Sequence, residues 1–383
     1  MKIKIIFNLR KHHYVARVSI FLVAVALIGG TVSCAQNTPS SYTLTIASTA
    51  GGSVTNPGEG SFNYAVGRVV DLVAAPDNGY LFACWTGDVG KVGNVNAATT
   101  NITMNGTYSI RANFVKRYNL AAGVYHTVGL KTDGTVVAVG ANAYGQCNVN
   151  NWTDIVQIAA GRYHTVGLKS DGTVVAVGMN WSGQCNVGNW TDIIQVAAGE
   201  EYTVGLKADG TVVAVGDNTS GQCDVGNWTG IIQVAAGRYH TLGLKLNDTV
   251  VAVGDNTSGQ CDVGNWTDIV QIAAGYGHTV GLKHNGILVA MGANDDGQCD
   301  FDNWTNIMQV TAGSFHTVGL KPNGTVVAVG ASASGQCDVV NWTGIIQVAA
   351  GGFHTVGLKP DGTVVAVGDT LYGQCNVVGW DLA

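Results

Sequence analysis

The feature that most constrains this 383-residue chain is a repeat of 38 residues, best seen within 154–188 as DIVQIAAGRYHTVGLKSDGTVVAVGMNWSGQCNVG. One glycine recurs at this spacing without drift, at Gly123, Gly161, Gly199, Gly237, Gly275, Gly313 and Gly351. The tract from Tyr118 to Ala383 is seven times 38 residues long, so it holds seven whole repeats. A period of this length indicates a unit that cannot bury its apolar face alone and must stack on copies of itself.

Each repeat has the pattern of short strands, and no helical period survives. In the second repeat we expect strands at Ile155–Ala160, Thr165–Lys169 and Thr173–Gly178, and a short fourth strand around Gln184–Val187. The pair Asp171-Gly172 supplies the positive-φ positions of a tight hairpin. The third strand is a continuous apolar run, so both of its faces should be covered by neighbouring repeats.

Small antiparallel sheets repeated seven times around an axis predict an all-β fold, a closed seven-bladed β-propeller over residues 118–383. The two ends of the tract support closure. The chain enters at Tyr118 without the Asn-Trp-Thr lead-in of the later repeats, and it leaves on Gly379-Trp380-Asp381-Leu382. We therefore expect the C-terminal segment to dock beside the first blade and complete the ring.

The first 35 residues predict an export signal. Five basic residues and no acidic residue lie within positions 1–17, and the apolar run that follows, 18–28, is too short to span a membrane. Thr31-Val32-Ser33-Cys34 resembles a bacterial lipobox, in which Cys34 would be lipidated. Ordinary cleavage after Ala35 is the alternative. Either outcome predicts an exported protein, lipid-anchored at the cell surface or secreted.

Residues 36–41 form a short polar linker, and residues 42–117 alternate polar and apolar positions between Gly, Asn and Pro turns, which predicts a small all-β domain. The stretches GGSVTNPGEGSFNY, GYLFACWTGD and ITMNGTYSIRANF are similar to the divergent internalin B-repeats of bacterial surface proteins. That resemblance implies a β-grasp-like module and a position at the cell surface, and it implies no chemistry.

The repeats themselves also resemble a family. AAGRYHTVGLKSDGTVVAVG followed by GQCNV is similar to the regulator of chromosome condensation repeats, in the short bacterial form also found in the secreted propeller-type β-lactamase inhibitor. The resemblance spans all seven repeats and implies the propeller fold. Members in eukaryotes act on a nuclear GTPase and chromatin, a function that an exported chain would not share.

Charge excludes some partners. The predicted signal carries five of the 19 basic residues and none of the 25 acidic ones, so its removal leaves an acidic chain. Residues 118–383 hold nine Lys and Arg against 21 Asp and Glu. Binding to nucleic acid or to an anionic membrane surface is therefore disfavoured, and we expect membrane association only through a lipid anchor. We expect a monomer.

No enzyme signature is present at the sequence level. The chain has no G-x-S-x-G, no H-E-x-x-H and no phosphate loop. We therefore expect no catalytic residue, no cofactor and no metal. An extracellular glycan hydrolase or lyase remains the alternative, because catalytic residues need not cluster in sequence.

Two residue types recur once in each repeat and invite a chemical interpretation. A cysteine recurs in all seven repeats, and because seven thiols cannot pair fully, we expect free buried thiols in the fourth strands. A histidine recurs in six repeats, with Tyr202 in the remaining one. We expect a hydrogen bond that fixes the loop between the first two strands of each blade in preference to a metal ligand.

The repeats differ mainly at two places, which we name the corner loop (161–163 in the second repeat) and the outer loop (179–183). In an up-and-down blade both loops emerge at one end, so their variable residues should share a surface, here called the binding face. Its members are Tyr125, Tyr144, Arg162, Tyr163, Trp181, Glu200, Glu201, Arg238, Tyr239, Tyr276, Phe315, Phe353 and Tyr372. These residue types are enriched in interface anchors. Drift of unconstrained loop residues is the alternative.

Together these features predict an exported protein that binds an extracellular protein or glycan through the binding face. A secreted inhibitor of another protein is one version of this function. Two competing hypotheses are the glycan-active enzyme and a surface scaffold that binds nothing.

Overall fold

The computed structural model describes residues 40–49, 51–76, 80–95, 97–116 and 120–383. Within these ranges the chain is almost entirely β, and the helical content is one short 3-10 turn, η1 (Val89–Lys91). The all-β prediction is confirmed. No helix in this part of the chain is long and apolar enough to cross a membrane. The predicted signal, including Cys34, lies outside the described residues.

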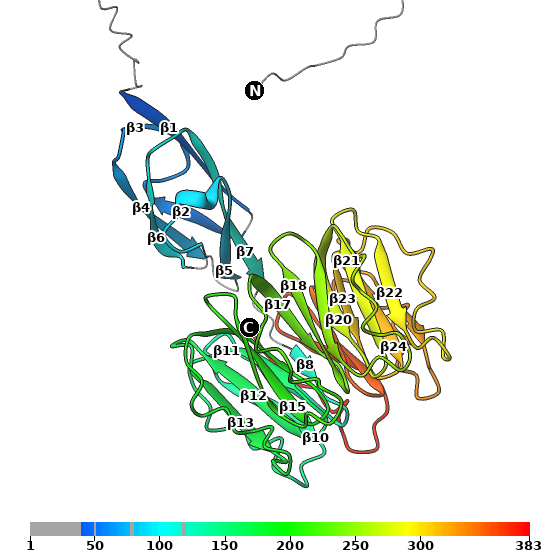
Figure 1. The fold of residues 1–383 in the computed structure, drawn as a ribbon. Helices are drawn as coiled ribbons and strands as arrows, with labels where there is room; N and C mark the ends of the chain where they lie inside the picture. The colour runs from blue at the N-terminus through cyan, green and yellow to red at the C-terminus, as the bar shows by residue number, and fades with distance from the viewer. Residues whose placement is uncertain (1–39, 50, 77–79, 96, 117–119) are drawn as a thin grey trace, which may run out of the picture. The chain divides into compact units, whose positions relative to one another are not determined.

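The N-terminal domain consists of two sheets (Figure 1). Its strands are β1 (Ser41–Ser48), β2 (Gly52–Asn56), β3 (Gly60–Ala65), β4 (Val69–Pro76), β5 (Tyr80–Gly87), β6 (Thr99–Thr103) and β7 (Tyr108–Lys116). One sheet has the order β3-β1-β7-β5, with β1 and β7 parallel, and the other has the order β2-β4-β6. Trp85 is buried in the shared core and donates from Nε1 to the carbonyl of Ala97 at 3.0 Å. The β-grasp-like arrangement stays a prediction.

Each of the seven repeats forms a separate antiparallel sheet of three strands (Figure 1). The first strands are β8 (Leu120–Ala122), β11 (Ile155–Ala160), β14 (Ile193–Ala198), β17 (Ile231–Ala236), β20 (Ile269–Ala274), β23 (Gln309–Ala312) and β26 (Gln347–Ala350). The second strands are β9 (His126–Leu130), β12 (His164–Lys169), β15 (Tyr202–Lys207), β18 (His240–Lys245), β21 (His278–Lys283), β24 (His316–Leu320) and β27 (His354–Leu358). The third strands are β10 (Val136–Gly140), β13 (Val174–Gly178), β16 (Val212–Gly216), β19 (Val250–Gly254), β22 (Leu288–Gly292), β25 (Val326–Gly330) and β28 (Val364–Gly368).

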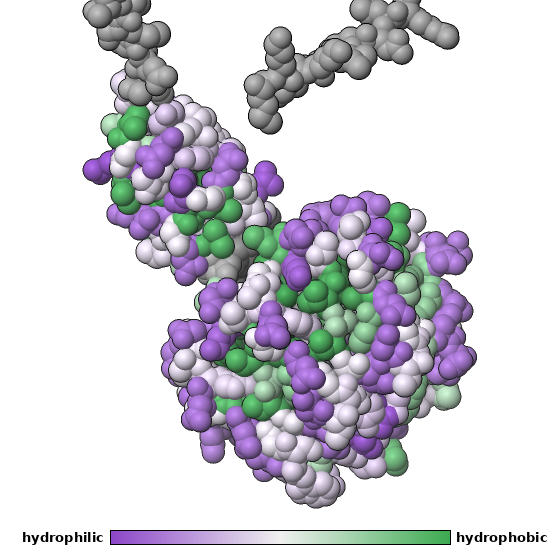
Figure 2. Space-filling view, in the orientation of Figure 1, coloured by the Kyte–Doolittle hydropathy of each residue, from purple (hydrophilic) through white to green (hydrophobic). Residues whose placement is uncertain are grey.

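Apolar side chains fill the space between neighbouring sheets. In the second repeat, Val166 and Leu168 of β12 pack against Ile193 and Val196 of β14 in the third. The same kind of cluster joins each repeat to the next, and one contains Leu120 of the first repeat with Val356 of the last. Figure 2 shows hydrophobic residues near the middle of the visible face of the repeats, with hydrophilic ones around them. Burial between sheets is therefore what makes the repeats stable as an array.

The hairpins between second and third strands differ from expectation in one respect. Only the second residue of each Asp-Gly pair has positive φ, as at Gly134 with φ 83°. The Asp133 carboxylate instead accepts hydrogen bonds from the Thr135 amide at 2.9 Å and hydroxyl at 2.6 Å. In the fourth repeat, where glycine is missing, Asp248 takes the positive φ of 62°.

The predicted fourth strand is wrong. Residues 184–187 form no strand: Gln184 and Cys185 lie in a turn, and the Val187 amide bonds locally to the carbonyl of Cys185 at 2.8 Å. The recurring cysteines lie in these turns as free, half-buried thiols. Cys185, for example, donates to the carbonyl of Met179 at 3.3 Å, and burial raises its pKa to about 11. The third strands are likewise half-buried beyond their first valine, less covered than their apolar sequence indicated.

The recurring glycine directly follows the first strand and lies against the backbone of the next repeat. A Cβ atom on Gly161 would lie 2.5 Å from the carbonyl oxygen of Gly199 in the next repeat and 2.2 Å from the His164 ring. The last repeat has the same relation to the first, because a Cβ on Gly351 would lie 2.4 Å from the carbonyl oxygen of Gly123. Only glycine fits here, and the reason is space between repeats, since these glycines do not have positive φ.

Each recurring histidine bonds to a threonine of the next repeat. His126 Nε2 lies 2.8 Å from Thr165 Oγ1, and that hydroxyl donates to the carbonyl of Gln146 at 2.7 Å. Because the hydroxyl has one hydrogen and Gln146 accepts it, His126 must donate from Nε2. The pattern recurs at His164, His240, His278, His316 and His354.

This histidine–threonine relay corrects the expectation of a bond within each blade. It links blades to one another, and His354 of the last repeat bonds to Thr127 of the first at 2.8 Å. In the third repeat the Tyr202 hydroxyl donates to the carbonyl of His240 in the fourth, so tyrosine keeps the link with a different acceptor. The preference for a hydrogen bond over a metal ligand is consistent with this geometry.

The relay predicts loss of stability in mild acid. Burial lowers the pKa of the six relay histidines from 6.5 to about 3 or 4. Their contribution to stability is therefore complete above pH 6.5 and is lost as the pH falls from 6.5 towards 4. In that window each relay histidine lowers the free energy of unfolding by about 1.4 kcal/mol per pH unit, because it stays neutral in the folded state while the unfolded one is protonated. Urea midpoints should fall from pH 7.5 to pH 5.0 and stay level from pH 7.5 to pH 8.5; a level midpoint down to pH 5.0 would contradict the prediction.

Candidate functional site

The corner loops of all seven repeats converge on one pocket at the axis of the propeller, here called the axial pocket. Its volume is about 300 Å³, and each repeat contributes its Ala-Gly pair and the residues that follow. Because the glycines and alanines form most of the wall, the character of the pocket depends on the variable residues. Those of the binding face that line it are Tyr125, Arg162, Glu200, Arg238, Tyr276, Phe315 and Phe353.

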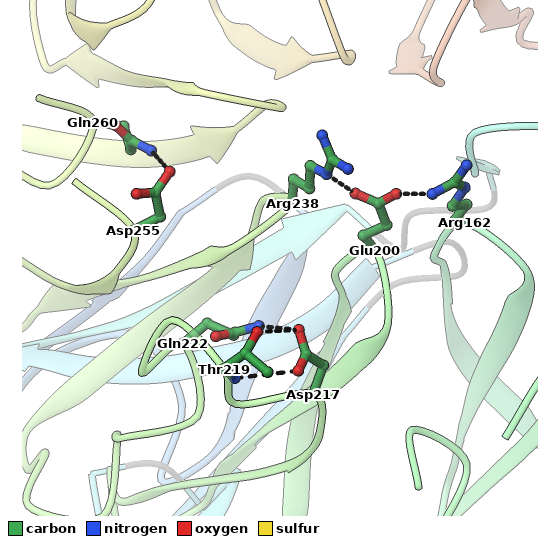
Figure 3. Close-up of polar contacts among 8 residues, drawn as sticks. All are labelled: Arg162, Glu200, Asp217, Thr219, Gln222, Arg238, Asp255 and Gln260. Atoms are coloured by element: carbon green, nitrogen blue, oxygen red, sulfur yellow. Dashed lines mark hydrogen bonds and ion pairs between the residues drawn. The ribbon is translucent and has the colours of Figure 1, made fainter. Parts of the chain in front are cut away.

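Three charged residues from consecutive repeats are joined in the axial pocket. Glu200 lies between the two arginines and pairs with Arg162 through Oε1 and with Arg238 through Oε2 (Figure 3). Only 8% of the Glu200 side chain is exposed, against 31% and 22% for Arg162 and Arg238. A carboxylate this buried needs both partners, since an unpaired buried charge is costly.

Aromatic rings cover both arginines. The Arg162 guanidinium carbon lies 5.0 Å from the centroid of the Tyr163 ring, and that of Arg238 lies 4.0 Å from the Tyr276 ring. Burial tends to lower the pKa of Arg162, but Glu200 and the neighbouring tyrosines raise it further, and the net shift is upward. Burial also raises the pKa of Tyr125. Each guanidinium therefore lies over two tyrosine rings, in the arrangement of a cation–π contact.

A continuous row of five rings, here called the aromatic row, extends outwards from the pocket. It runs Tyr372, Tyr125, Tyr163, Tyr144 and Trp181, with successive centroids 5.1 to 5.4 Å apart. Tyr125 and Tyr163 come from corner loops, and Tyr144, Trp181 and Tyr372 come from outer loops, so three repeats contribute to the row. Trp181 is 79% exposed and Tyr372 is 50% exposed, so the row ends in open ring faces.

The remaining members of the binding face lie beside these groups. Tyr239 stacks with Arg238 at 4.5 Å, and Tyr276, Phe315 and Phe353 form a second set of contacting rings. Glu201 accepts a hydrogen bond from Ser182, next to Trp181, at 3.2 Å. The structure thus brings all thirteen predicted residues together at one end of the propeller.

Three residues outside the thirteen also line the pocket: Val124, Ser314 and Gly352. They occupy the variable corner-loop position of the arginines, but the prediction does not include them among the binding-face residues. The ion pairs across three repeats were missed as well, although identical repeat positions in consecutive repeats would have indicated them. Within the described residues no three His, Cys, Asp or Glu side chains are grouped to hold a metal ion.

Comparisons with known protein families match most of the described chain. Residues 42–117 match the divergent InlB B-repeat domain. The regulator of chromosome condensation (RCC1) repeat matches once in every repeat, at 119–146, 155–184, 193–222, 231–260, 269–298, 307–336 and 345–374. A comparison with curated proteins found no match.

Solved structures share the fold at low sequence identity. The ectodomain of the receptor kinase CR4 from Physcomitrella patens has a TM-score of 0.55 at 21% identity, over 66% of this chain and 73% of that one. The CRINKLY WD40 ectodomain of the receptor kinase ACR4 from Arabidopsis thaliana has a TM-score of 0.54 at 20% identity, over 66% and 97%.

Prp20p from Saccharomyces cerevisiae, described with its binding to Gsp1p and histones, has a TM-score of 0.51 at 20% identity, over 61% of this chain and 80% of that one. At this identity the likeness concerns the β-propeller fold alone. The repeat matches cover more than half of the sequence, and every repeat found from the 38-residue period is among them. The chain therefore belongs to the RCC1 repeat family.

Proposed function

We propose that the protein binds a macromolecular partner through the binding face, and that this partner is a protein outside the cell. The observation that carries the proposal is the convergence of thirteen variable residues around the axial pocket. Constant positions of the repeat hold the sheets together, whereas the variable ones collect in the corner and outer loops. Tyr, Trp and Arg are the residues that most often dominate binding energy at protein interfaces.

The exposed end of the aromatic row gives the proposal its strongest physical support. Leaving Trp181 79% exposed forgoes the free energy of burying a large ring. A ring of this size in water, continuous with four others, is typical of a surface that is covered in a complex. Prp20p is described with its binding to Gsp1p and histones, which agrees with protein binding as a use of this fold.

A glycan is the second candidate partner. Open ring faces such as those of Trp181 and Tyr372 suit the apolar faces of sugar rings as well as protein side chains. A glycan-active enzyme would use the same surface, and turnover of a glycan by the purified protein would favour it.

Export and anchoring belong to the proposal too. The basic and apolar segments of residues 1–35 support an export signal, and Cys34 would carry a lipid if the lipobox is used. The acidic composition of the repeats supports a partner other than nucleic acid. The proposed location is the cell surface or the surrounding medium, and the proposed state is a monomer.

Closure of the seven repeats into a ring is likewise inferred. A Cβ on Gly129 of the first repeat would lie 2.8 Å from the Trp380 ring, as one on Gly167 would lie 2.7 Å from Trp152. The Leu382 amide donates to the carbonyl of Gly362 in the last repeat at 3.0 Å. The C-terminal segment thus contacts both ends of the array, and it occupies the place that Trp152 and its neighbours hold in the second repeat.

Removing residues 379–383 should destabilise the propeller sharply. The deletion removes Trp380 and the buried Leu382, and with them part of the packing between the last and first repeats. We expect the thermal midpoint to fall by several degrees, because losing two large packed side chains costs roughly 4 kcal/mol or more. Val378→Ala is the matched control, since this neighbouring side chain is 95% exposed. An unchanged midpoint after the deletion would argue against closure.

Partner binding should depend on the binding face. We would change five residues singly to Ala: Arg162, Tyr163, Trp181, Arg238 and Tyr239. Where the residue is an interface anchor, the change should weaken partner capture by more than an order of magnitude, equivalent to about 2 kcal/mol. Pull-downs or a glycan array measure the capture. Ile287→Ala is the control, because this side chain is 47% exposed at the hairpin end. Undiminished binding by all five variants would place the site elsewhere.

A further inference from the structure

The axial pocket differs in charge from the rest of the propeller. Seven of the nine basic residues within 118–383 are lysines at one repeat position, at or just beyond the end of the second strand. The other two are Arg162 and Arg238, and both line the pocket. The only cations among the corner loops therefore meet in one small cavity at the axis.

One carboxylate holds these two cations together without neutralising them. Glu200 pairs with Nη1 of Arg162 and with Nε of Arg238. The three side chains carry a net charge of +1 in a pocket that is otherwise lined by small residues and aromatic rings. A monoanion would bring this cluster to neutrality.

Hydrogen-bond donors remain for such an anion. Arg162 pairs with Glu200 through Nη1, and its Nε is too buried to reach a ligand, so Arg238 is the main source of such donors. Arg238 uses Nε for its ion pair, and its two terminal nitrogens lie on the side away from Glu200 (Figure 3). A guanidinium fork of this kind matches the two oxygens of a carboxylate.

We propose that the axial pocket binds one carboxylate of the protein partner, either an acidic side chain or the chain terminus. This inference rests on the proposed function and names the chemistry recognised at its centre. A cavity of about 300 Å³ is at the small end for ligand sites and suits one side chain with an apolar body against Tyr276 and Phe315. A phosphate group, with its charge of about −1.5 to −2, would exceed the net charge of the cluster and be repelled by Glu200.

The test uses N-acetylphenylalanine as the carboxylate probe and its neutral amide as the matched control. Both are titrated into the mature protein at low salt and pH 7 and followed by NMR or calorimetry. We expect the acid to bind with a dissociation constant on the order of 1 mM and the amide to bind at least about tenfold more weakly. Equal binding of acid and amide would overturn the proposal.

Two variants should act in opposite directions. Arg238→Gln removes a donor and should weaken acid binding about tenfold. Glu200→Gln raises the net charge of the cluster from +1 to +2 and should strengthen acid binding severalfold. Misfolding cannot produce that gain, so its absence would contradict the proposal. Lys245→Gln, at the hairpin end of the same repeat as Arg238, should leave acid binding unchanged.

Glucuronate serves as a third probe. Tighter binding of glucuronate than of N-acetylphenylalanine would overturn the assignment to a protein carboxylate in favour of an acidic glycan.

Failure of the carboxylate proposal is distinguishable from failure of the proposed function. If the acid does not bind but Trp181→Ala impairs partner capture, the pocket chemistry is wrong and the binding face stands. If the acid binds but no variant of the binding face affects capture, the binding face is wrong.

Discussion

The hydrogen bond from each relay histidine to a threonine of the next repeat is the interaction on which the rest of the structure depends. It is fully buried, and it continues into the carbonyl of a glutamine, so each link satisfies three polar groups without water. The link also sets the spacing of the repeats at the axis, where His164 fills the space beside Gly161 and leaves room for hydrogen alone. Because only backbone and small residues lie beside the axis here, the corner loops of all seven repeats come close enough to line one pocket.

Much of the fold could be predicted because one copy of the repeat constrains the others. The period, the three strands and the turn at each Asp-Gly pair follow from apolar pattern and turn chemistry. The absence of a fourth strand could not be predicted, because Gln184 to Val187 have a strand-like composition. Their amides make local hydrogen bonds instead of pairing with the third strand. Periodicity also cannot distinguish a contact within a repeat from one between repeats. This is why the sequence predicts the histidine bond within a blade, whereas the structure has it between neighbouring blades.

The candidate site shows the same limit. That Arg162, Tyr163 and Trp181 share an end of the propeller follows from the alternation of loops along an antiparallel sheet. That Glu200 joins Arg162 to Arg238 depends on the distance between neighbouring corner loops, which only the packed sheets determine. The aromatic row combines corner and outer loops of three repeats, an arrangement that a linear sequence does not display. Repeat positions that vary little therefore hold the array, and the variable loop positions make the surface.

The most direct test of this account is the free energy of unfolding of Thr165→Val, measured by urea denaturation at pH 7.5. The variant keeps the shape of the side chain but leaves the His126 Nε2–H and the Gln146 carbonyl without their partner. Because each unsatisfied buried group costs about 1 to 3 kcal/mol, we expect a loss of at least about 2 kcal/mol. Thr135→Val, which removes only an exposed hydroxyl bond to Asp133, should cost less than about 1 kcal/mol. Equal, small losses in both variants would contradict the claim that the relay holds the repeats together.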